Sequence, residues 1–152
     1  MSIKIITKNR KAYHDYEVGD KFEAGIELKG TEVKALRIGK VNLNDGWVDI
    51  SSEGEAFLVD ASIGHYSHGN LFNHPETRPR RLLLHKNEIA KLLRGVAEKG
   101  YSIIPLMVYF KGRYIKLEVA LARGKKAYDK RQSEKTKDAN REITRALRHK
   151  NR

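Results

Sequence analysis

Alternation of apolar and polar residues indicates that most of this chain forms β-strands. In segment 21–28 every second residue is apolar, from Phe22 to Leu28, as expected of a strand with one buried face. A glycine-centred turn at 111–113 separates two strand-like runs and predicts a β-hairpin. Many short strands separated by turn residues predict a mainly β fold, a small barrel or sandwich. The predicted strands are 21–28, 40–43, 47–51, 55–62, 80–84, 102–109 and 114–122.

A helical period of apolar residues is clearest near the middle of the second half. Four apolar residues from Ile89 to Val96 have the i, i+3, i+4, i+7 spacing of an amphipathic helix, and Gly100 is placed to end it. Two shorter segments have helix-compatible patterns, one of which stops before Gly39. The three predicted helices are 9–16, 31–38 and 86–99.

Positive charge is concentrated at the C-terminal end. The chain of 152 residues has 31 Lys and Arg against 19 Asp and Glu, a formal net charge of +12. Residues 123–152 hold 12 basic and 4 acidic residues, a net charge of +8, which leaves +4 for the preceding 122 residues. An excess of this size favours a polyanionic partner. The split predicts a folded body at 1–122 and a basic tail at 123–152.

The predicted tail has too few apolar residues to pack firmly on the body. As a helix it would align opposite charges three residues apart, but its apolar stripe holds only Ala139, Ile143, Ala146 and Leu147. An isolated helix of this length is marginal in water. We therefore expect a flexible tail that is disordered in the free protein and becomes helical on an anionic surface.

Composition excludes several classes of protein. The chain contains no cysteine, which excludes a disulfide scaffold, a thiol nucleophile and a cysteine-ligated zinc site. Apolar runs such as 103–108 fall far short of the ~20 residues that span a bilayer. Residues 1–10 lack the apolar stretch of a secretory signal. These observations predict a cytoplasmic protein with no membrane partner, and we expect a monomer.

Three nearby histidines, His65, His68 and His74, are the candidate metal ligands. No carboxylate close to them is placed as a further ligand, so polar loop histidines are the favoured interpretation. The sequence has no Gly-x-Ser-x-Gly elbow and no glycine-rich phosphate-binding loop. A histidine-dependent metallonuclease is an alternative, but we expect no enzyme activity and no cofactor.

Three clustered arginines are candidate RNA contacts. Alternate side chains of an extended segment share one face, so Arg78 and Arg80 could point together at phosphates, with Arg81 beside them. A solvated charge run in front of a buried strand is an equally good interpretation. Aromatic residues among basic ones could stack unpaired bases, and Trp47 and Tyr128 are the foremost candidates.

Six segments carry a specific combination of motifs. Segment 9–16 reads Asn-Arg-Lys-Ala-Tyr-His-Asp-Tyr, and segment 74–84 reads His-Pro-Glu-Thr-Arg-Pro-Arg-Arg-Leu-Leu-Leu. Segment 124–131 reads Gly-Lys-Lys-Ala-Tyr-Asp-Lys-Arg. With further matches at 22–37, 39–42 and 54–57, the chain closely resembles the SmpB (small protein B) family, the bacterial partners of transfer-messenger RNA, over nearly its whole length.

The resemblance implies a small antiparallel β-barrel of the oligonucleotide-binding (OB) type with flanking helices. It also implies an adaptor for trans-translation that binds the tRNA-like domain of transfer-messenger RNA (SsrA RNA), replaces the missing anticodon arm and brings this RNA to stalled ribosomes. The tail would enter the empty decoding site and mRNA channel of the small subunit and become helical there. A structural ribosomal protein, bound to subunits whether or not they are stalled, is the alternative.

The resemblance further implies particular site residues. Asn9 and Glu23 match family positions tied to binding of transfer-messenger RNA. Leu83 and His85 match the end of another motif, and we expect Leu83 to be a packing residue that shapes the RNA surface. The expected RNA-binding residues of the body are Asn9, Tyr16, Glu23, Trp47, Arg78, Arg80, Arg81, Leu83 and His85. The expected ribosome-binding residues of the tail are Lys125, Lys126, Tyr128, Asp129, Lys130, Arg131, Lys137, Arg141, Arg145 and Leu147.

Overall fold

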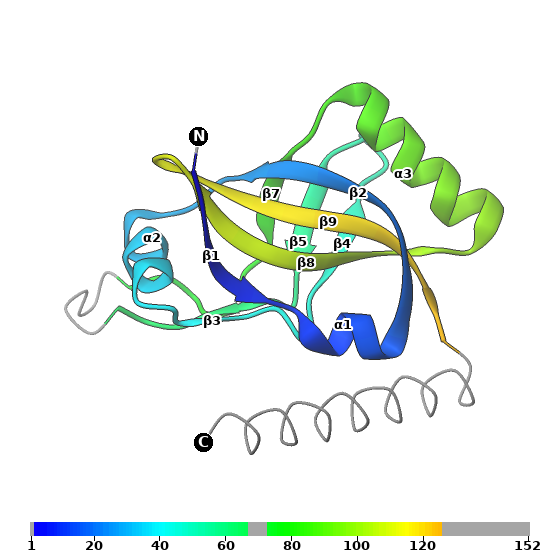
Figure 1. The fold of residues 1–152 in the computed structure, drawn as a ribbon. Helices are drawn as coiled ribbons and strands as arrows, with labels where there is room; N and C mark the ends of the chain where they lie inside the picture. The colour runs from blue at the N-terminus through cyan, green and yellow to red at the C-terminus, as the bar shows by residue number, and fades with distance from the viewer. Residues whose placement is uncertain (1, 67–72, 126–152) are drawn as a thin grey trace, which may run out of the picture.

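In the computed structural model, which describes residues 2–66 and 73–125, the chain folds around one seven-stranded antiparallel sheet with three helices (Figure 1). Two of these helices, α2 and α3, lie near opposite ends of the sheet in the view of Figure 1. The helices are α1 (Arg10–Asp15), α2 (Gly30–Arg37) and α3 (Lys86–Lys99). The strands are β1 (Ile3–Lys8), β2 (Tyr16–Ile26), β3 (Val41–Asn42), β4 (Trp47–Ile50), β5 (Ala56–Val59), β6 (Ser62–Ile63), β7 (Arg80–Leu83), β8 (Ser102–Lys111) and β9 (Tyr114–Gly124).

The large sheet is open. Its strand order is β1-β8-β9-β2-β7-β5-β4, so β1 and β4 are its edges, and β3 pairs with β6 in a separate ribbon. The edge strand β4 comes close to β8, but within the described residues no hydrogen-bonded ladder joins the two. The prediction of a mainly β, antiparallel fold with about three helices is confirmed. The barrel expected from the resemblance is not closed.

The predicted strands are misplaced where the period of two is interrupted. β2 begins at Tyr16 instead of Lys21, because its pairing with β9 shifts register between Val18 and Lys21 and breaks the alternation. The predicted strand 55–62 is divided into β5 and β6 at Asp60, whose φ of 61° cannot continue an extended strand. The edge strand β1 is not predicted, since its burial does not alternate.

The helix and hairpin predictions are confirmed. α3 has the predicted bounds, and Gly100 ends it in the left-handed conformation with a φ of 66°. α1 and α2 lie within one residue of their predicted bounds. β8 and β9 are joined by the two-residue turn Gly112–Arg113, where Gly112 adopts a φ of 60°.

The main core lies on the inner face of the curved sheet. Leu36 of α2, Leu92 of α3 and Leu117 of β9 are among its buried members. α3 approaches β9 so closely that a Cβ atom on Gly95 would lie 2.6 Å from Leu121 Cδ1. A second, smaller cluster forms on the opposite, outer face, where α1 covers the start of β8 and the end of β9. The outer face beyond α1 has exposed side chains.

A buried ion cluster joins α2 to β7 and to the segment before it. The Glu32 carboxylate accepts hydrogen bonds from Arg78 Nη2 and Arg80 Nε, each at 2.5 Å. The side chains of Glu32 and Arg80 are both fully buried. Burial of a charge requires a charged partner and satisfied hydrogen bonds. The remaining nitrogens of Arg80 meet this requirement by donating to the carbonyl oxygens of Ala61, Pro75 and Glu76.

This ion cluster corrects the expectation for two of the three arginines. Arg78 and Arg80 do point the same way, but they point at Glu32 inside the protein and not outward at phosphates. The cause is the buried carboxylate, which the sequence pattern of an exposed arginine run does not reveal. Arg81 follows on the strand, faces the other way, and has a side chain that is 47% exposed. Of the three arginines, Arg81 is the most exposed, and its Nη2 lies 3.8 Å from Glu55 Oε1 at the surface.

The ionisation of Glu32 is linked to the stability of the fold. Burial opposes ionisation, but hydrogen bonds from Arg78, from the backbone N–H of Lys29 at 2.8 Å and from Arg80 outweigh it and hold the pKa of Glu32 below its usual 4.5. A carboxyl whose pKa is lower in the folded state stabilises the fold above the pKa of the unfolded chain. That contribution is lost as the pH falls through the lower pKa of the folded state.

We expect Glu32→Gln to lower the free energy of unfolding at pH 7 by about 3–5 kcal/mol, because two arginines then lose their buried counter-charge. Urea unfolding measures this, and Glu53→Gln in the exposed turn before β5 is the matched control, with a change within about 0.5 kcal/mol. The difference between wild type and Glu32→Gln should shrink as the pH falls below 4.5. A difference that does not depend on pH would contradict the assignment of the effect to the Glu32 charge.

Candidate nucleic-acid interface

A row of cross-strand partners runs across the outer face, with exposed side chains at both ends and the buried Tyr109 within it. Ile5 of β1 pairs with Tyr109 of β8, which pairs with Lys116 of β9. Lys116 in turn pairs with Gly25 of β2, and Gly25 with Leu83 of β7. Residues that are directly paired in an antiparallel sheet project to the same side. The register therefore brings five strands, distant in sequence, together on one surface.

Glu23 lies beside this row and is held by two side chains of β8. It accepts a hydrogen bond from the Tyr109 hydroxyl, and Lys111 Nζ lies 3.1 Å from one of its oxygens and 3.3 Å from the other. The Tyr109 hydrogen bond lowers the pKa of Glu23, and Lys111 and Lys116 add to this effect against the opposing effect of burial. Burial, together with the Glu23 carboxylate, raises the pKa of Tyr109. The site thus presents an oriented, ionised carboxylate flanked by cations.

Glu23 is among the expected RNA-binding residues, but its partners Tyr109, Lys111 and Lys116 are not. Tyr109 and Lys111 are two residues apart in β8, which places them on one face of the strand. That spacing was available as a signal. The alignment of β8 with β2 across β9 could not be read from the sequence, because a register shift between Pro105 and Met107 interrupts the pairing of β8 with β9.

Leu83 lies at the β7 end of the row and is exposed. Its side chain is 51% accessible, which is more than a packing residue needs in order to shape the surface, so it is also placed to touch a partner directly. The alternation of β7 explains this exposure, because Arg80 and Leu82 face inward and Arg81 and Leu83 face outward. Gly25 makes room for it, since a Cβ atom on Gly25 would lie 3.2 Å from Leu83 Cβ.

A shallow groove of about 410 Å³ borders this part of the outer face. It runs from Glu23 and Lys116, past Arg81 and Leu83, to His85 at the start of α3. His85 is exposed, and its backbone N–H donates to Glu88 Oε1 at 3.0 Å. The structure therefore brings together Glu23, Arg81, Leu83 and His85 of the expected RNA-binding residues.

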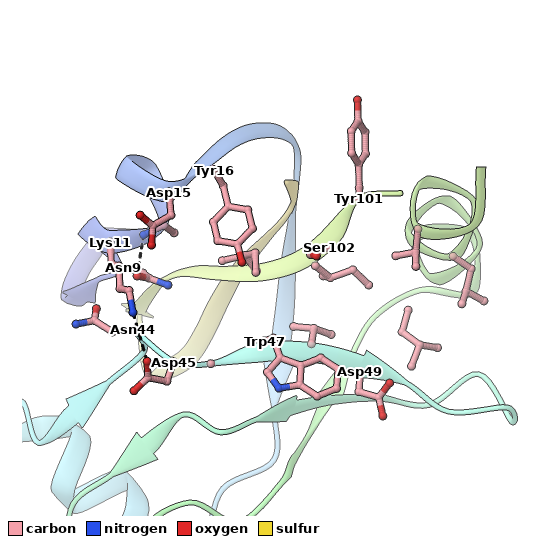
Figure 2. A pocket seen from close by; sticks show the side chains of 18 residues that line it. Asn9, Lys11, Asp15, Tyr16, Asn44, Asp45, Trp47, Asp49, Tyr101 and Ser102 are labelled. Carbon is pink, nitrogen blue, oxygen red and sulfur yellow. Dashed lines mark hydrogen bonds and ion pairs between the residues drawn. The ribbon is translucent and has the colours of Figure 1, made fainter. Parts of the chain in front are cut away.

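Three other expected residues lie at a second groove, of about 540 Å³, in the open seam between β4 and the start of β8 (Figure 2). Tyr16 and Trp47 line it from opposite sides, and Figure 2 shows their rings on either side of the gap. Asn9 lies at the end near α1. Figure 2 also shows three carboxylates along the groove, those of Asp15, Asp45 and Asp49.

Asn9 acts on the fold at this seam. It is only 1% exposed and caps α1 by accepting a hydrogen bond from the Ala12 backbone N–H at 3.1 Å. Its side-chain amide donates to the carbonyl oxygens of Pro105 at 2.8 Å and Leu43 at 3.3 Å. Asn9 is therefore placed to position α1 and the β8 backbone, and not to touch an external partner.

Trp47 is exposed but fixed. Its side chain projects from the edge strand β4 with 42% exposure, and its indole N–H donates to Asp60 Oδ2 at 3.0 Å. Lys11 also lines this groove, and its Nζ lies 3.5 Å from Asp45 Oδ1. The charged residues that line the seam groove are thus three aspartates and Lys11, whereas Arg81 and Lys116 lie beside Glu23, Glu55 and Glu88 along the outer-face groove.

The candidate metal ligands do not form a metal site in the described part of the chain. His74 is buried, with Nδ1 2.8 Å from the Thr31 hydroxyl and Nε2 2.9 Å from the Ile63 carbonyl oxygen. Both of its ring nitrogens are therefore engaged within the protein. No cluster of three or more His, Cys, Asp or Glu side chains suited to a metal occurs among residues 2–66 and 73–125. His68 lies outside these residues.

The beginning of the tail is anchored to α1. β9 continues to Gly124, and the Lys125 backbone N–H donates to the Asp15 carbonyl oxygen at 2.8 Å. Lys125 Nζ donates to the carbonyl oxygen of Tyr13 at 3.0 Å. The other expected tail residues lie outside the described residues; they are Lys126, Tyr128, Asp129, Lys130, Arg131, Lys137, Arg141, Arg145 and Leu147.

No helix in the described residues has the length and apolar character needed to cross a membrane.

Comparison with known proteins gives full-length matches. Residues 6–149 match the family model described as SmpB protein. The SsrA-binding protein of Carboxydothermus hydrogenoformans is 54% identical over 95% of this chain and 97% of its own, and that of Geotalea uraniireducens is 54% identical over all of both chains. A chain of the solved structure described as "tmRNA-SmpB: a journey to the center of the bacterial ribosome" is 47% identical. It covers 80% of this chain and 85% of its own, with a TM-score of 0.67.

The agreement extends from sequence to backbone. The six motif segments, the antiparallel sheet with three helices in the described residues, and the full-length identity to SsrA-binding proteins all point the same way. The chain therefore belongs to the SmpB protein family.

Proposed function

We propose that this protein binds the tRNA-like domain of transfer-messenger RNA and delivers that RNA to stalled ribosomes, as a non-enzymatic adaptor of trans-translation. Membership of the family supports this, because its relatives carry the name SsrA-binding protein and the similar solved chain belongs to a structure described by tmRNA, SmpB and the bacterial ribosome. The observation that carries the proposal is the outer face, where an oriented carboxylate, cations and an exposed Leu83 share one surface. Such an adaptor acts in the cytoplasm and needs no cofactor.

Each group on the outer face has a use in binding a folded RNA. Lys116, Lys111 and Arg81 can contact phosphates, which supply most of the affinity of protein–nucleic acid complexes. The Glu23 carboxylate repels phosphates but accepts hydrogen bonds from base amino groups and ribose hydroxyls. The apolar side chain of Leu83 can pack on a base or sugar. This mixture favours recognition of RNA shape over attraction by bulk charge.

The seam groove is a weaker candidate for the RNA backbone. Asp15, Asp45 and Asp49 would lie close to phosphates there, and among the described residues that line this groove Lys11 is the one lysine or arginine. Stacking of a base on Trp47 or Tyr16 stays a prediction. We place the tRNA-like domain on the outer face and treat the seam groove as the competing location that experiment must exclude.

We assign the second task, engagement of the ribosome, to residues 123–152. Their net charge of +8 suits a channel lined by RNA phosphates. We propose that this tail occupies the empty decoding site and mRNA channel of the small subunit and becomes helical there, while the body stands in for the missing anticodon arm. Lys125, hydrogen-bonded to α1, fixes the point from which the tail leaves the body.

Substitution of two exposed leucines tests whether RNA binds the outer face or the seam groove. Leu83 is 51% exposed on the outer face, and Leu93 is 43% exposed on α3 beside the seam groove. We expect Leu83→Asp to weaken binding of a transcribed tRNA-like domain about tenfold or more, since it removes an apolar contact and adds a charge that phosphates repel. Leu93→Asp, the matched control, should bind as the wild type does. Fluorescence anisotropy measures both, with circular dichroism to verify folding.

The reverse result, with only Leu93→Asp impaired, would place the RNA in the seam groove. A wild-type protein that ignores the tRNA-like domain, yet sediments with ribosomal subunits whether or not they are stalled, would contradict the adaptor and favour a structural ribosomal protein. RNA cleavage by the purified protein would contradict the non-enzymatic assignment.

Deletion of residues 128–152 should separate the two tasks. We expect the shortened protein to keep its affinity for the tRNA-like domain, because the outer face is intact. Release of stalled ribosomes in a reconstituted translation system should be lost, because the basic segment that enters the channel is gone. Retained release by the shortened protein would refute the function assigned to the tail.

A further inference from the structure

We propose that Tyr114, at the tip of the β8–β9 hairpin, is a stacking platform for one unpaired base of the bound RNA, and that Arg113 and Lys116 hold the adjoining phosphates. This inference rests on the proposed function and extends the RNA-binding surface to a residue that lies outside both grooves. It identifies the partner by its chemistry, as a single-stranded nucleotide next to a phosphate backbone.

Tyr114 has the exposure and the neighbours that such a platform needs. It is 52% exposed, although large aromatic side chains usually bury most of their surface. The Arg113 guanidinium carbon lies 5.4 Å from the centre of its ring, and Lys116 Nζ lies 6.0 Å from it. An exposed ring flanked by cations is the arrangement with which proteins bind single-stranded nucleic acid, because the ring stacks a base and the cations contact its backbone.

The register makes Tyr114 continuous with the rest of the outer face. Tyr114 pairs directly with Lys111, and Lys111 Nζ contacts the Glu23 carboxylate. Lys111 also pairs with Ile3 of β1, whose side chain is 55% exposed. Since paired residues project to one side, Ile3, Lys111 and Tyr114 form a second cross-strand row parallel to the one that ends at Leu83.

The hairpin holds this ring in a defined position. Tyr114 is the first residue of β9 and follows a two-residue turn that Gly112 closes with a φ of 60°. Such a short connection allows little freedom to the residues that flank it. The entropy lost on stacking a base is then mainly that of the side chain, because the backbone that carries the ring is already fixed before the RNA arrives.

Tyr13 provides a matched control for an exposed tyrosine. It is 43% exposed, and Lys21 Nζ lies 5.8 Å from the centre of its ring. It belongs to α1, which packs at the opposite end of β9 from Tyr114. A general effect of removing a surface tyrosine should appear at both positions, whereas stacking of a base should appear at Tyr114 alone.

The test measures the dissociation constant of the full chain for a transcribed tRNA-like domain over a range of salt concentrations. Tyr114→Ala should weaken binding roughly 5- to 100-fold, the effect of losing one base–aromatic stack, with an unchanged dependence on salt. Tyr114→Trp should bind as tightly as the wild type or more tightly, and Tyr13→Ala should bind as the wild type does. Arg113→Ala should flatten the salt dependence by about 0.7 to 0.9 in log–log slope, the value of one lost phosphate contact.

Wild-type affinity in Tyr114→Ala would overturn the platform. If Leu83→Asp is impaired in the same experiment, the proposed function stands and the platform alone fails. If the wild type itself does not bind the tRNA-like domain, the proposed function fails. A loss in Tyr114→Ala that Tyr114→Trp does not restore would also overturn it, because stacking requires only an aromatic ring.

Discussion

The buried contact of Glu32 with Arg78 and Arg80 determines which residues this protein presents on its surface. Side chains alternate along a strand, so burial of Arg80 on the inner face requires Arg81 and Leu83 to face outward. A slip of one residue in β7 would leave Glu32 without its partner and would turn Leu83 into the core. The ion cluster therefore sets the register of the strand that carries one end of the outer face. Arg78 and Arg80, which were expected to contact RNA, thus position Leu83, another expected contact.

Openness of the sheet gives the body two distinct surfaces. Because β4 does not pair with β8, a seam remains that is lined by aromatic and acidic side chains and stabilised by the buried Asn9. On the outer face away from α1, the cross-strand rows bring lysines, an oriented Glu23 and exposed apolar side chains together. The modest charge of the body is thus distributed unevenly. The outer face is suited to a folded RNA, and the highly basic tail to a phosphate-lined channel.

Sequence alone predicted what local pattern determines. The period of apolar residues in α3, the hairpin around Gly112 and the concentration of charge beyond residue 122 needed no knowledge of tertiary contacts. The direction and the partners of individual side chains could not be predicted without knowledge of tertiary contacts. The arginine-rich segment alone does not predict that its buried partner is Glu32, 46 residues before Arg78. Similarly, the register shifts in the β2–β9 and β8–β9 pairings hide the alignment that brings Tyr109 to Glu23. Motif resemblance identified Leu83 as important, but only the alternation of β7 places it outside.

Chemical-shift mapping of the 15N-labelled protein during titration with the tRNA-like domain tests the central claim most directly. If the outer face is the RNA-binding surface, the largest changes will fall on Glu23, Leu83, Tyr109 and Lys116 and extend to Tyr114 at the hairpin tip. The amides around Trp47 and Leu93 will change little. Changes that are confined to the seam groove, with the β7 and β9 signals unmoved, would contradict this account of how the fold builds its function.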